Sequence, residues 1–282
     1  MEKMVSKFTG LEYELKFIDD FDGDELNLDN WTVYNQIYNS WEEQANIPEN
    51  VYVKDGSLFI KGTRDDKVHH AHHDYFEDNE SDLIGGSVRS DNKVEFCYGR
   101  LEIKAKYPYS YGMWPCFWTM GTDRGWPWGG EIDIAEFVGG VDQWNNYRDD
   151  EYSCGLHWAD PDTTPEDAWS GKGHLATSIG KLKMSRDLPN VPERTARLND
   201  DWHIYGLEWT KDKMICYFDD VKVGEIDITD PTMRFAFHRN HYIILNFGMG
   251  GSWAGTPNEE KGTVFPQYLQ IDWVKIWQTT EQ

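Results

Sequence analysis

The sequence predicts an all-β fold of the sandwich class, and three observations support this prediction. Apolar and polar residues alternate with period two in many short runs, which is the pattern of half-buried strands. Turn residues such as Lys54-Asp55-Gly56 and Phe218-Asp219-Asp220 separate these runs, and no long stretch has helical periodicity. The clearest strand candidates are 51–53, 57–60, 99–106, 203–209, 214–218 and 242–246.

The length and composition favour a single domain that covers residues 1–282. All-β sandwiches often reach this length as one unit, and 39% hydrophobic residues are enough for a large core. The 14 Trp, 15 Tyr and 13 Phe exceed what packing usually needs, so some rings are expected on a binding surface. Residues 159–201 lack a clear strand pattern and are rich in Pro, Asp and Thr, so we expect an elaborated loop beside the site.

The charge of the chain restricts its partners. The sequence has 27 Lys+Arg against 50 Asp+Glu, a formal net charge of −23, which repels phosphate backbones and anionic lipids. We therefore expect no nucleic-acid partner and no membrane partner. We expect a neutral substrate, because no basic cluster is visible to receive anions. We also expect a monomer.

The four cysteines show no CxxC spacing and lie in strand-like sequence, so neither a zinc site nor a disulfide framework is predicted. Buried free thiols are expected instead. The first residues contain no apolar signal segment, and no stretch reaches the length of a transmembrane helix. The expected location is secreted or cell-envelope with the signal peptide absent from this chain, and an intracellular location stays open.

The segment 131–136, Glu-Ile-Asp-Ile-Ala-Glu, carries the strongest chemical signal. Side chains alternate along a strand, so Glu131 and Asp133 share a face about 7 Å apart, whereas Glu136 has the wrong parity. A β-bulge at Ile134 or Ala135 would return Glu136 to that face. Inward-leaning Glu131 and Glu136 side chains can then approach the ~5–5.5 Å of a retaining glycosidase pair.

The segment 130–136 resembles the catalytic motif of glycoside hydrolase family 16, in the longer E-x-D-x-x-E form of laminarinases and agarases. The resemblance extends from about residue 17 to residue 278 and includes five further segments. These are 98–106, 112–118, 202–209, 246–253 and 271–277. The family implies a concanavalin-like β-jelly-roll sandwich with a concave substrate cleft.

The resemblance also implies a role for each carboxylate. Glu131 would be the nucleophile, Glu136 the acid and base, and Asp133 the residue that hydrogen-bonds Glu131 and holds its charge state. No cofactor is expected for this chemistry. The implied activity is a retaining endo-β-glucanase acting on β-1,3-glucan or mixed β-1,3-1,4-glucan.

Other candidate residues rest on tryptophan content and on positions that match the family. Indole rings suit the apolar faces of sugar rings, although core packing competes for each of them. His157 is expected to contact Glu136. The full set of expected substrate-binding residues is Trp114, Trp118, Trp126, Arg100, His157, Asn246, Trp253 and Glu42.

The resemblance further implies a structural Ca²⁺ site. Its expected ligands are Asp20, the backbone of Gly56 and Asp272, with Asp20 in place of the family's usual Glu.

Two alternative functions remain open. An endo-β-galactan or O-glycan hydrolase could use the same scaffold, because the long segment 159–201 departs from the compact laminarinase pattern. A non-catalytic glycan-binding jelly roll is the other alternative. Three crowded acids argue against it, because like charges at close range destabilise a fold and a lectin gains nothing from them.

Overall fold

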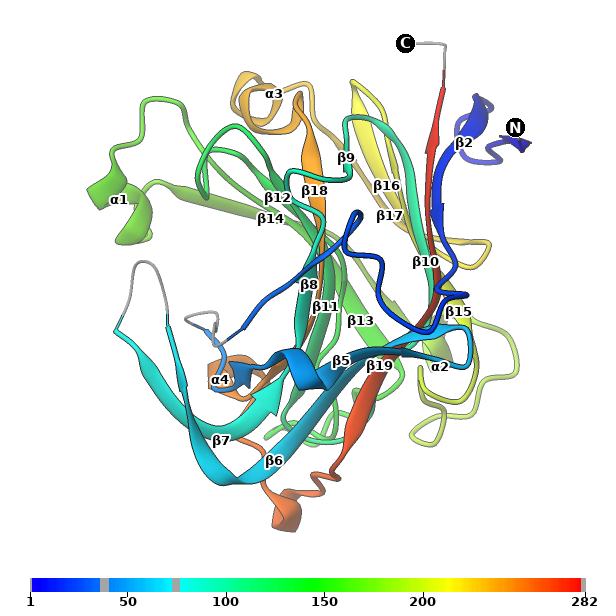
Figure 1. Cartoon of the computed structure of the whole chain (residues 1–282). Helices are drawn as coiled ribbons and strands as arrows, with labels where there is room; N and C mark the ends of the chain where they lie inside the picture. Colours follow the sequence, from blue (N-terminus) through cyan, green and yellow to red (C-terminus); the bar gives the residue numbers. More distant parts are fainter. Residues whose placement is uncertain (1, 36–40, 73–76, 280–282) are drawn as a thin grey trace.

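The computed structural model describes residues 2–35, 41–72 and 77–279, and most of its regular structure is β. The strands pack as two curved layers, as the jelly-roll prediction required (Figure 1). The first layer contains β3 (Thr32–Val33), β8 (Ser87–Arg89), β9 (Glu95–Phe96), β18 (His241–Met249), β11 (Met113–Gly121), β12 (Glu131–Glu136), β13 (Glu151–Ala159) and β14 (His174–Lys183).

The second layer continues from the first, because β14 pairs with β17 at Gly180 and Gly224. Its strands are β17 (Val221–Asp227), β16 (Lys213–Phe218), β15 (His203–Trp209), β10 (Gly99–Lys106), β19 (Gln267–Gln278), β2 (Glu12–Asp19) and β1 (Lys3–Val5). The long strand β6 (Ser57–Ala71) pairs with β5 (Val51–Lys54) and β19, then with β7 (Asn79–Gly85), beside which β4 (Ala45–Asn46) lies.

Short helices fill the connections between strands. They are η1 (Pro48–Asn50), α1 (Pro165–Trp169), α2 (Met184–Asp187), α3 (Pro231–Phe237), α4 (Gly251–Ala254) and η2 (Glu259–Lys261). Among the described residues, none of these helices has the length and apolar character needed to cross a bilayer.

The core lies between the two layers and follows from alternation along each strand. On β12, Ile132 and Ile134 are buried with at most 1% exposure, and both belong to the main core cluster. Phe117, Leu156 and Leu245 bury the inner faces of their own strands in the same way. Consequently the opposite face of the first layer is left for polar side chains.

The strand candidates of the sequence are confirmed, but the expectation that residues 159–201 form a loop was wrong. This segment contains α1, the ten-residue strand β14 and α2. Strand β14 buries only Ile179 and Leu182 within its length, so it shows too few apolar positions to produce the period-two pattern. The four cysteines are free thiols, as predicted, and Cys116, Cys154 and Cys216 are buried.

Candidate active site

Strand β12 has the bulge that the sequence predicted. Towards β11, Trp118 pairs with Asp133 while Phe117 pairs with Ala135, so Ile134 is the extra residue. The register towards β13 shifts across the same stretch. The bulge therefore corrects the parity of Glu136, while the apolar residues between the acids stay in the core.

Asp133 is the most deeply buried of the three acids and holds its proton. Asp133 is only 4% exposed. This burial, followed by the charges of Glu131 and Glu136, raises the pKa of Asp133 well above the ordinary range. Hydrogen bonding between Asp133 and Glu131 raises the pKa of Asp133 further and lowers that of Glu131. The proton thus belongs to Asp133, which supports an ionised Glu131.

Glu131 and Glu136 both titrate near neutrality. Burial, and then repulsion by Glu136, raises the pKa of Glu131 to about 7, against the opposing influence of the Trp126 indole and of Asp133. Burial is also the main reason that the pKa of Glu136 is about 7; the charge of Glu42 adds to it. At neutral pH the pair can therefore hold one proton and one negative charge, which a double displacement requires.

Trp114 and Trp118 lie on the carboxylate face of β11, as predicted, but they have different partners. The indole Nε1 of Trp114 donates to Oε1 of Glu136 at 3.0 Å and so lowers the pKa of that acid. Trp118 Nε1 instead donates to Oδ1 of Asn246 at 2.7 Å. The amide of Asn246 in turn donates to Oε1 of buried Glu42 at 3.2 Å. Trp118, Asn246 and Glu42 thus form one network beside Glu136, although sequence reasoning placed them only singly.

His157 lies at the other end of β12, and the expected contact with Glu136 was wrong. It pairs with Glu131 across β13, and its Nε2 lies 3.5 Å from Oδ2 of Asp133. Burial, and then the neighbouring His174, lowers the pKa of His157 to about 4, so the ring is neutral in the working range. Ser153 is the residue that pairs with Glu136. The bulge shifts the register between Asp133 and Glu136, and this shift separates His157 from Glu136.

Trp126 belongs to an aromatic group at this same end that the sequence did not reveal. Its ring lies 5.3 Å from that of Trp169 in α1 and 4.9 Å from that of His174 at the start of β14. His174 also contacts His157, with 2.8 Å between Nε2 and Nδ1. The sequence did not reveal this group because residues 159–201 were expected to form a loop, whereas His174 is placed near Asp133 by strand β14.

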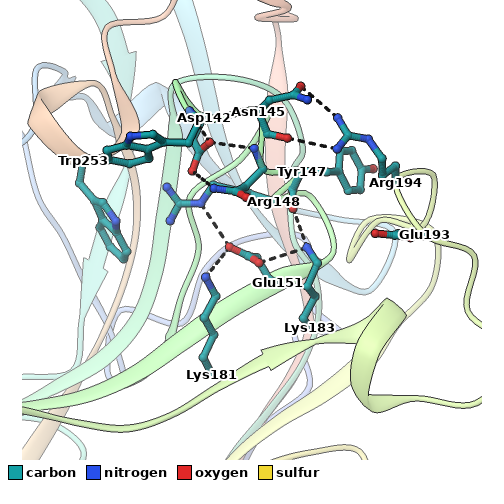
Figure 2. A pocket seen from close by; sticks show the side chains of 12 residues that line it. Asp142, Asn145, Tyr147, Arg148, Glu151, Lys181, Lys183, Glu193, Arg194 and Trp253 are labelled. Atoms are coloured by element: carbon teal, nitrogen blue, oxygen red, sulfur yellow. Dashed lines mark hydrogen bonds and ion pairs between the residues drawn. The ribbon is translucent and has the colours of Figure 1, made fainter.

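Trp253 lies at the Glu136 end, where its ring packs edge-on against Trp114 at 5.2 Å. A cavity of about 480 Å³ opens beside it (Figure 2). The guanidinium of Arg148 lies 5.4 Å from the Trp253 ring, and Trp144 is 74% exposed on the same cavity. This cavity extends the aromatic surface away from the carboxylates.

The cations of this cavity are largely paired. Figure 2 shows Arg148, Lys181 and Lys183 converging on Glu151. Lys183 also binds buried Asp150 at 2.8 Å. Positive charge does gather here, but the acids that accompany it leave a polar surface rather than a strongly cationic one.

Arg100 does not lie with the carboxylates, so its expected substrate contact was wrong. It belongs to β10 in the second layer, where its side chain is 6% exposed and forms ion pairs with Glu208 at 2.9 Å and Glu102 at 3.0 Å. Tyr217 packs against its guanidinium at 4.6 Å. Arg100 was expected at the substrate from a family position alone, and the local pattern could not say which layer its strand belonged to.

The segments that carry the expected calcium ligands Asp20, Gly56 and Asp272 lie side by side, because Asp19 pairs with Val274 and Leu58 pairs with Ile271. Asp272 is neutralised by Lys104, with 2.7 Å between Oδ2 and Nζ, and Asp20 is exposed. Within the described parts of the chain, the one grouping of three possible metal-binding side chains is Glu131, Asp133 and His157, which is the carboxylate site itself. The ammonium group of Lys104 competes with Ca²⁺ for Asp272, and the calcium site stays a prediction.

The arrangement can therefore perform acid–base and nucleophilic chemistry on a neutral sugar. It offers an ionised carboxylate supported by a protonated neighbour, a second carboxyl that titrates near pH 7, and indole rings on both sides. These are the requirements for general-acid catalysis with a carboxylate nucleophile.

Comparison with known proteins agrees with this geometry. A family model described as "Beta-porphyranase A-D, GH16 domain" matches residues 14–279. A β-glucanase of Rhodothermus marinus is 27% identical over 289 residues, which cover 95% of this chain and 86% of the relative.

Two solved structures are similar over nearly the whole chain. The endo-β-1,3-glucanase of Pyrococcus furiosus has a TM-score of 0.75 at 25% identity, with 100% of both chains covered. A structure from work on endo-acting O-glycanases of the human gut microbiota has the same TM-score and identity and covers 95% of this chain and 92% of its own. The chain belongs to glycoside hydrolase family 16, in the group that the β-porphyranase GH16 model describes.

Proposed function

We propose that the chain is a retaining endo-β-glucanase that hydrolyses neutral β-1,3-glucan or mixed β-1,3-1,4-glucan. The observation that carries this proposal is the bulged strand β12, which presents Glu131, Asp133 and Glu136 on one face between indole rings. The main influences on the pKa of these three acids are burial, other acids and hydrogen bonds. A substrate without charge suits such a site.

The reaction follows from the protonation states. Ionised Glu131 attacks the anomeric carbon while Glu136 gives its proton to the departing glycosidic oxygen, which forms a glycosyl-enzyme and releases one end of the polysaccharide. Glu136, now ionised, takes a proton from water as the water attacks the same carbon and expels Glu131. Asp133 keeps its proton throughout and stabilises Glu131 whenever that carboxylate is ionised.

Retention is the general mechanism of family 16, and the proposal predicts its stereochemical result. Proton NMR of the first products should show the β anomer before mutarotation. Immediate appearance of the α anomer would contradict double displacement at Glu131.

The glucan assignment is supported by the glucanase relatives and by the paired charges beside Trp253. We propose that the polysaccharide continues from Trp114 past Trp253 into the cavity, where the exposed ring of Trp144 and the hydrogen-bonding groups of Arg148 meet a distal sugar. A Trp144→Ala variant should raise KM for a long glucan more than for a short oligosaccharide. Equal increases for both would argue against a distal contact.

A second candidate is an endo-β-galactan or O-glycan hydrolase. The β-porphyranase family model and the similarity to the gut O-glycanase structure favour it, as do α1 and β14, which add aromatic residues around Trp126. A galactan with sulfate groups would meet a chain of net charge −23, so its hydrolysis would need local cations such as Arg148 and Arg194.

Product profiling on laminarin, lichenan, agarose, porphyran and mucin glycans separates the two candidates. For a neutral glucan, the rate should change little between about 10 mM and 0.5 M salt, a range over which the Debye length falls from about 30 Å to a few ångströms. A preference for porphyran or mucin glycans, or a steep loss of activity with salt, would replace the glucan proposal by the second candidate.

We also propose that the protein is a monomer. We further propose that it acts outside the cytoplasm, because a polysaccharide of this kind does not cross a membrane unaided. Light scattering after size-exclusion chromatography and fractionation of the producing cells test these two points.

A further inference from the structure

His174 and His157 form a pair of neutral rings next to the carboxylates, and the reaction described above does not use them. The rings stack with 4.9 Å between centroids and 24° between planes, and Nδ1 of His157 lies 2.8 Å from Nε2 of His174. His157 Nε2, on the other side of the same ring, lies 3.5 Å from Oδ2 of Asp133. The two histidines thus form a chain of groups that ends at the acid supporting Glu131.

One atom in this chain needs a donor. Oδ2 of Asp133 is buried and has no hydrogen-bond partner of good geometry among the described residues. The 3.5 Å to His157 is long for a hydrogen bond, but such contacts in a free enzyme often shorten when substrate binds. His157 Nε2 is therefore the group placed to satisfy this oxygen, provided that it carries the proton.

We propose that His174 is a positioning residue that decides where His157 carries its proton, and this proposal rests on the proposed hydrolytic role of Glu131. Each neutral imidazole has one N–H and one acceptor nitrogen, so the contact between the rings allows two arrangements. If His174 Nε2–H donates to Nδ1 of His157, then His157 has its proton on Nε2, directed at Asp133. If His157 Nδ1–H donates instead, a lone pair of Nε2 faces Asp133.

The two arrangements have opposite effects on Glu131. In the first, Oδ2 of Asp133 accepts from His157, so the carboxyl proton of Asp133 stays on the oxygen that serves Glu131. In the second, that proton is drawn to the oxygen facing the His157 lone pair, and Glu131 loses a donor. Because a hydrogen bond to the ionised form lowers a pKa, only the first arrangement keeps Glu131 ionised in the working range.

The Trp126 ring lies 4.9 Å from the ring of His174 and holds it beside His157 in both arrangements, so the buried Oδ2 of Asp133, which needs a donor, is the observation that favours the first. The other titratable groups that influence these carboxylates come from several elements. They are Glu42, Cys116 on β11, Cys154 on β13, Cys216 on β16 and Tyr242 on β18, besides Glu136 on β12 itself. His174 itself contacts His157.

The first experiment compares two amides at position 174. The amide nitrogen of Gln occupies the place of His Nε2, whereas that of Asn occupies the place of Nδ1 and falls short of His157. His174→Leu and His174→Asn should therefore move the acidic limb of the kcat/KM profile upward by about one pH unit, since they remove a donor chain to a charged group. His174→Gln should leave that limb where it is in the unmodified protein.

The comparison is informative because a merely structural role predicts another result. A loss of packing would lower kcat or the melting temperature without moving the limb, and Asn and Gln would then differ little. His174 is only half-buried at the first position of β14, and the three variants are compared after circular dichroism confirms equal folding. Identical limbs in Asn and Gln variants would overturn the proposal.

The second experiment needs no substrate, so it separates this inference from the proposed function. Long-range ¹H–¹⁵N spectra distinguish imidazoles protonated on Nε2 from those protonated on Nδ1, and spectra of His157→Gln and His174→Leu assign the two rings among the nine histidines. We expect His157 with its proton on Nε2, and a mixture of both forms in His174→Leu. A proton found on Nδ1 of His157 would overturn the proposal even if the enzyme hydrolyses glucan, whereas inactivity on every polysaccharide would overturn the proposed function alone.

Discussion

The hydrogen bond from Trp114 to Glu136 offers a direct test of which carboxyl acts as the acid. Trp114→Phe keeps an aromatic ring but removes the indole N–H that lies 3.0 Å from Oε1 of Glu136. This N–H favours the ionised acid, so its loss raises the pKa of Glu136 above its value of about 7. A hydrogen bond to a charged group is worth about 1.5–3 kcal/mol, and 1.36 kcal/mol corresponds to one pKa unit, so a rise of about one to two units is expected.

The assay is the pH profile of kcat/KM, whose basic limb reports the acid of the free enzyme. The limb should move upward by about one to two units in Trp114→Phe. Trp118→Phe is the matched control, because Trp118 donates to Asn246 and not to a catalytic acid. The two glutamates interact, so each limb belongs to the pair, but a shift in one variant and not in the other identifies the donor. An unmoved limb in Trp114→Phe, or an equal shift in Trp118→Phe, would refute the assignment of Glu136.

Three further predictions concern stability. Glu131→Gln should abolish hydrolysis and yet melt at a higher temperature than the unmodified protein at pH 8. The reason is that burial raises the pKa of Glu131 from 4.5 to about 7, so the native state of the unmodified protein loses up to about 3 kcal/mol of stability as pH rises through this window. The melting temperatures of the two proteins should converge below pH 4.5. Arg100→Met should lower the free energy of unfolding by about 3–5 kcal/mol, because it leaves Glu208 buried without its cation, while KM stays unchanged; a raised KM would return Arg100 to the substrate site. The calcium prediction for Asp20, Gly56 and Asp272 expects EDTA to lower the melting temperature, because a cation bound to the native state stabilises it; an unmoved melting curve in metal-free buffer would show that Lys104 alone neutralises Asp272.

The sequence was informative where a local pattern determines structure. Alternation located the strands, and the parity of three acids on β12 required an irregularity that the register contains at Ile134. Trp114 and Trp118 were expected from tryptophan content and family positions, and the structure places both on the carboxylate face of β11, with Trp114 donating to Glu136 and Trp118 to Asn246.

The remaining features depend on contacts between distant segments. Arg100 is buried in the second layer because its strand pairs with β15 and β19, and no local pattern encodes that choice. Strand β14 is mostly exposed and forms through backbone pairing with β13, so its own side chains give little signal. His174 and its contact with His157 could not be anticipated without that strand.

The extra residue in β12 separates distance along the chain from position on the sheet. Deleting Ile134 would leave the acids alternating regularly, with Glu, Asp and Glu still on one side and apolar residues on the other. Deleting Ile132, only two positions earlier, would instead turn one carboxylate into the core, at a cost of several kcal/mol. A deletion at Ile134 therefore keeps every side chain on its own face of the sheet, whereas a deletion at Ile132 does not. Homologous enzymes can differ in length at the bulge without any change in which side chains meet the sugar.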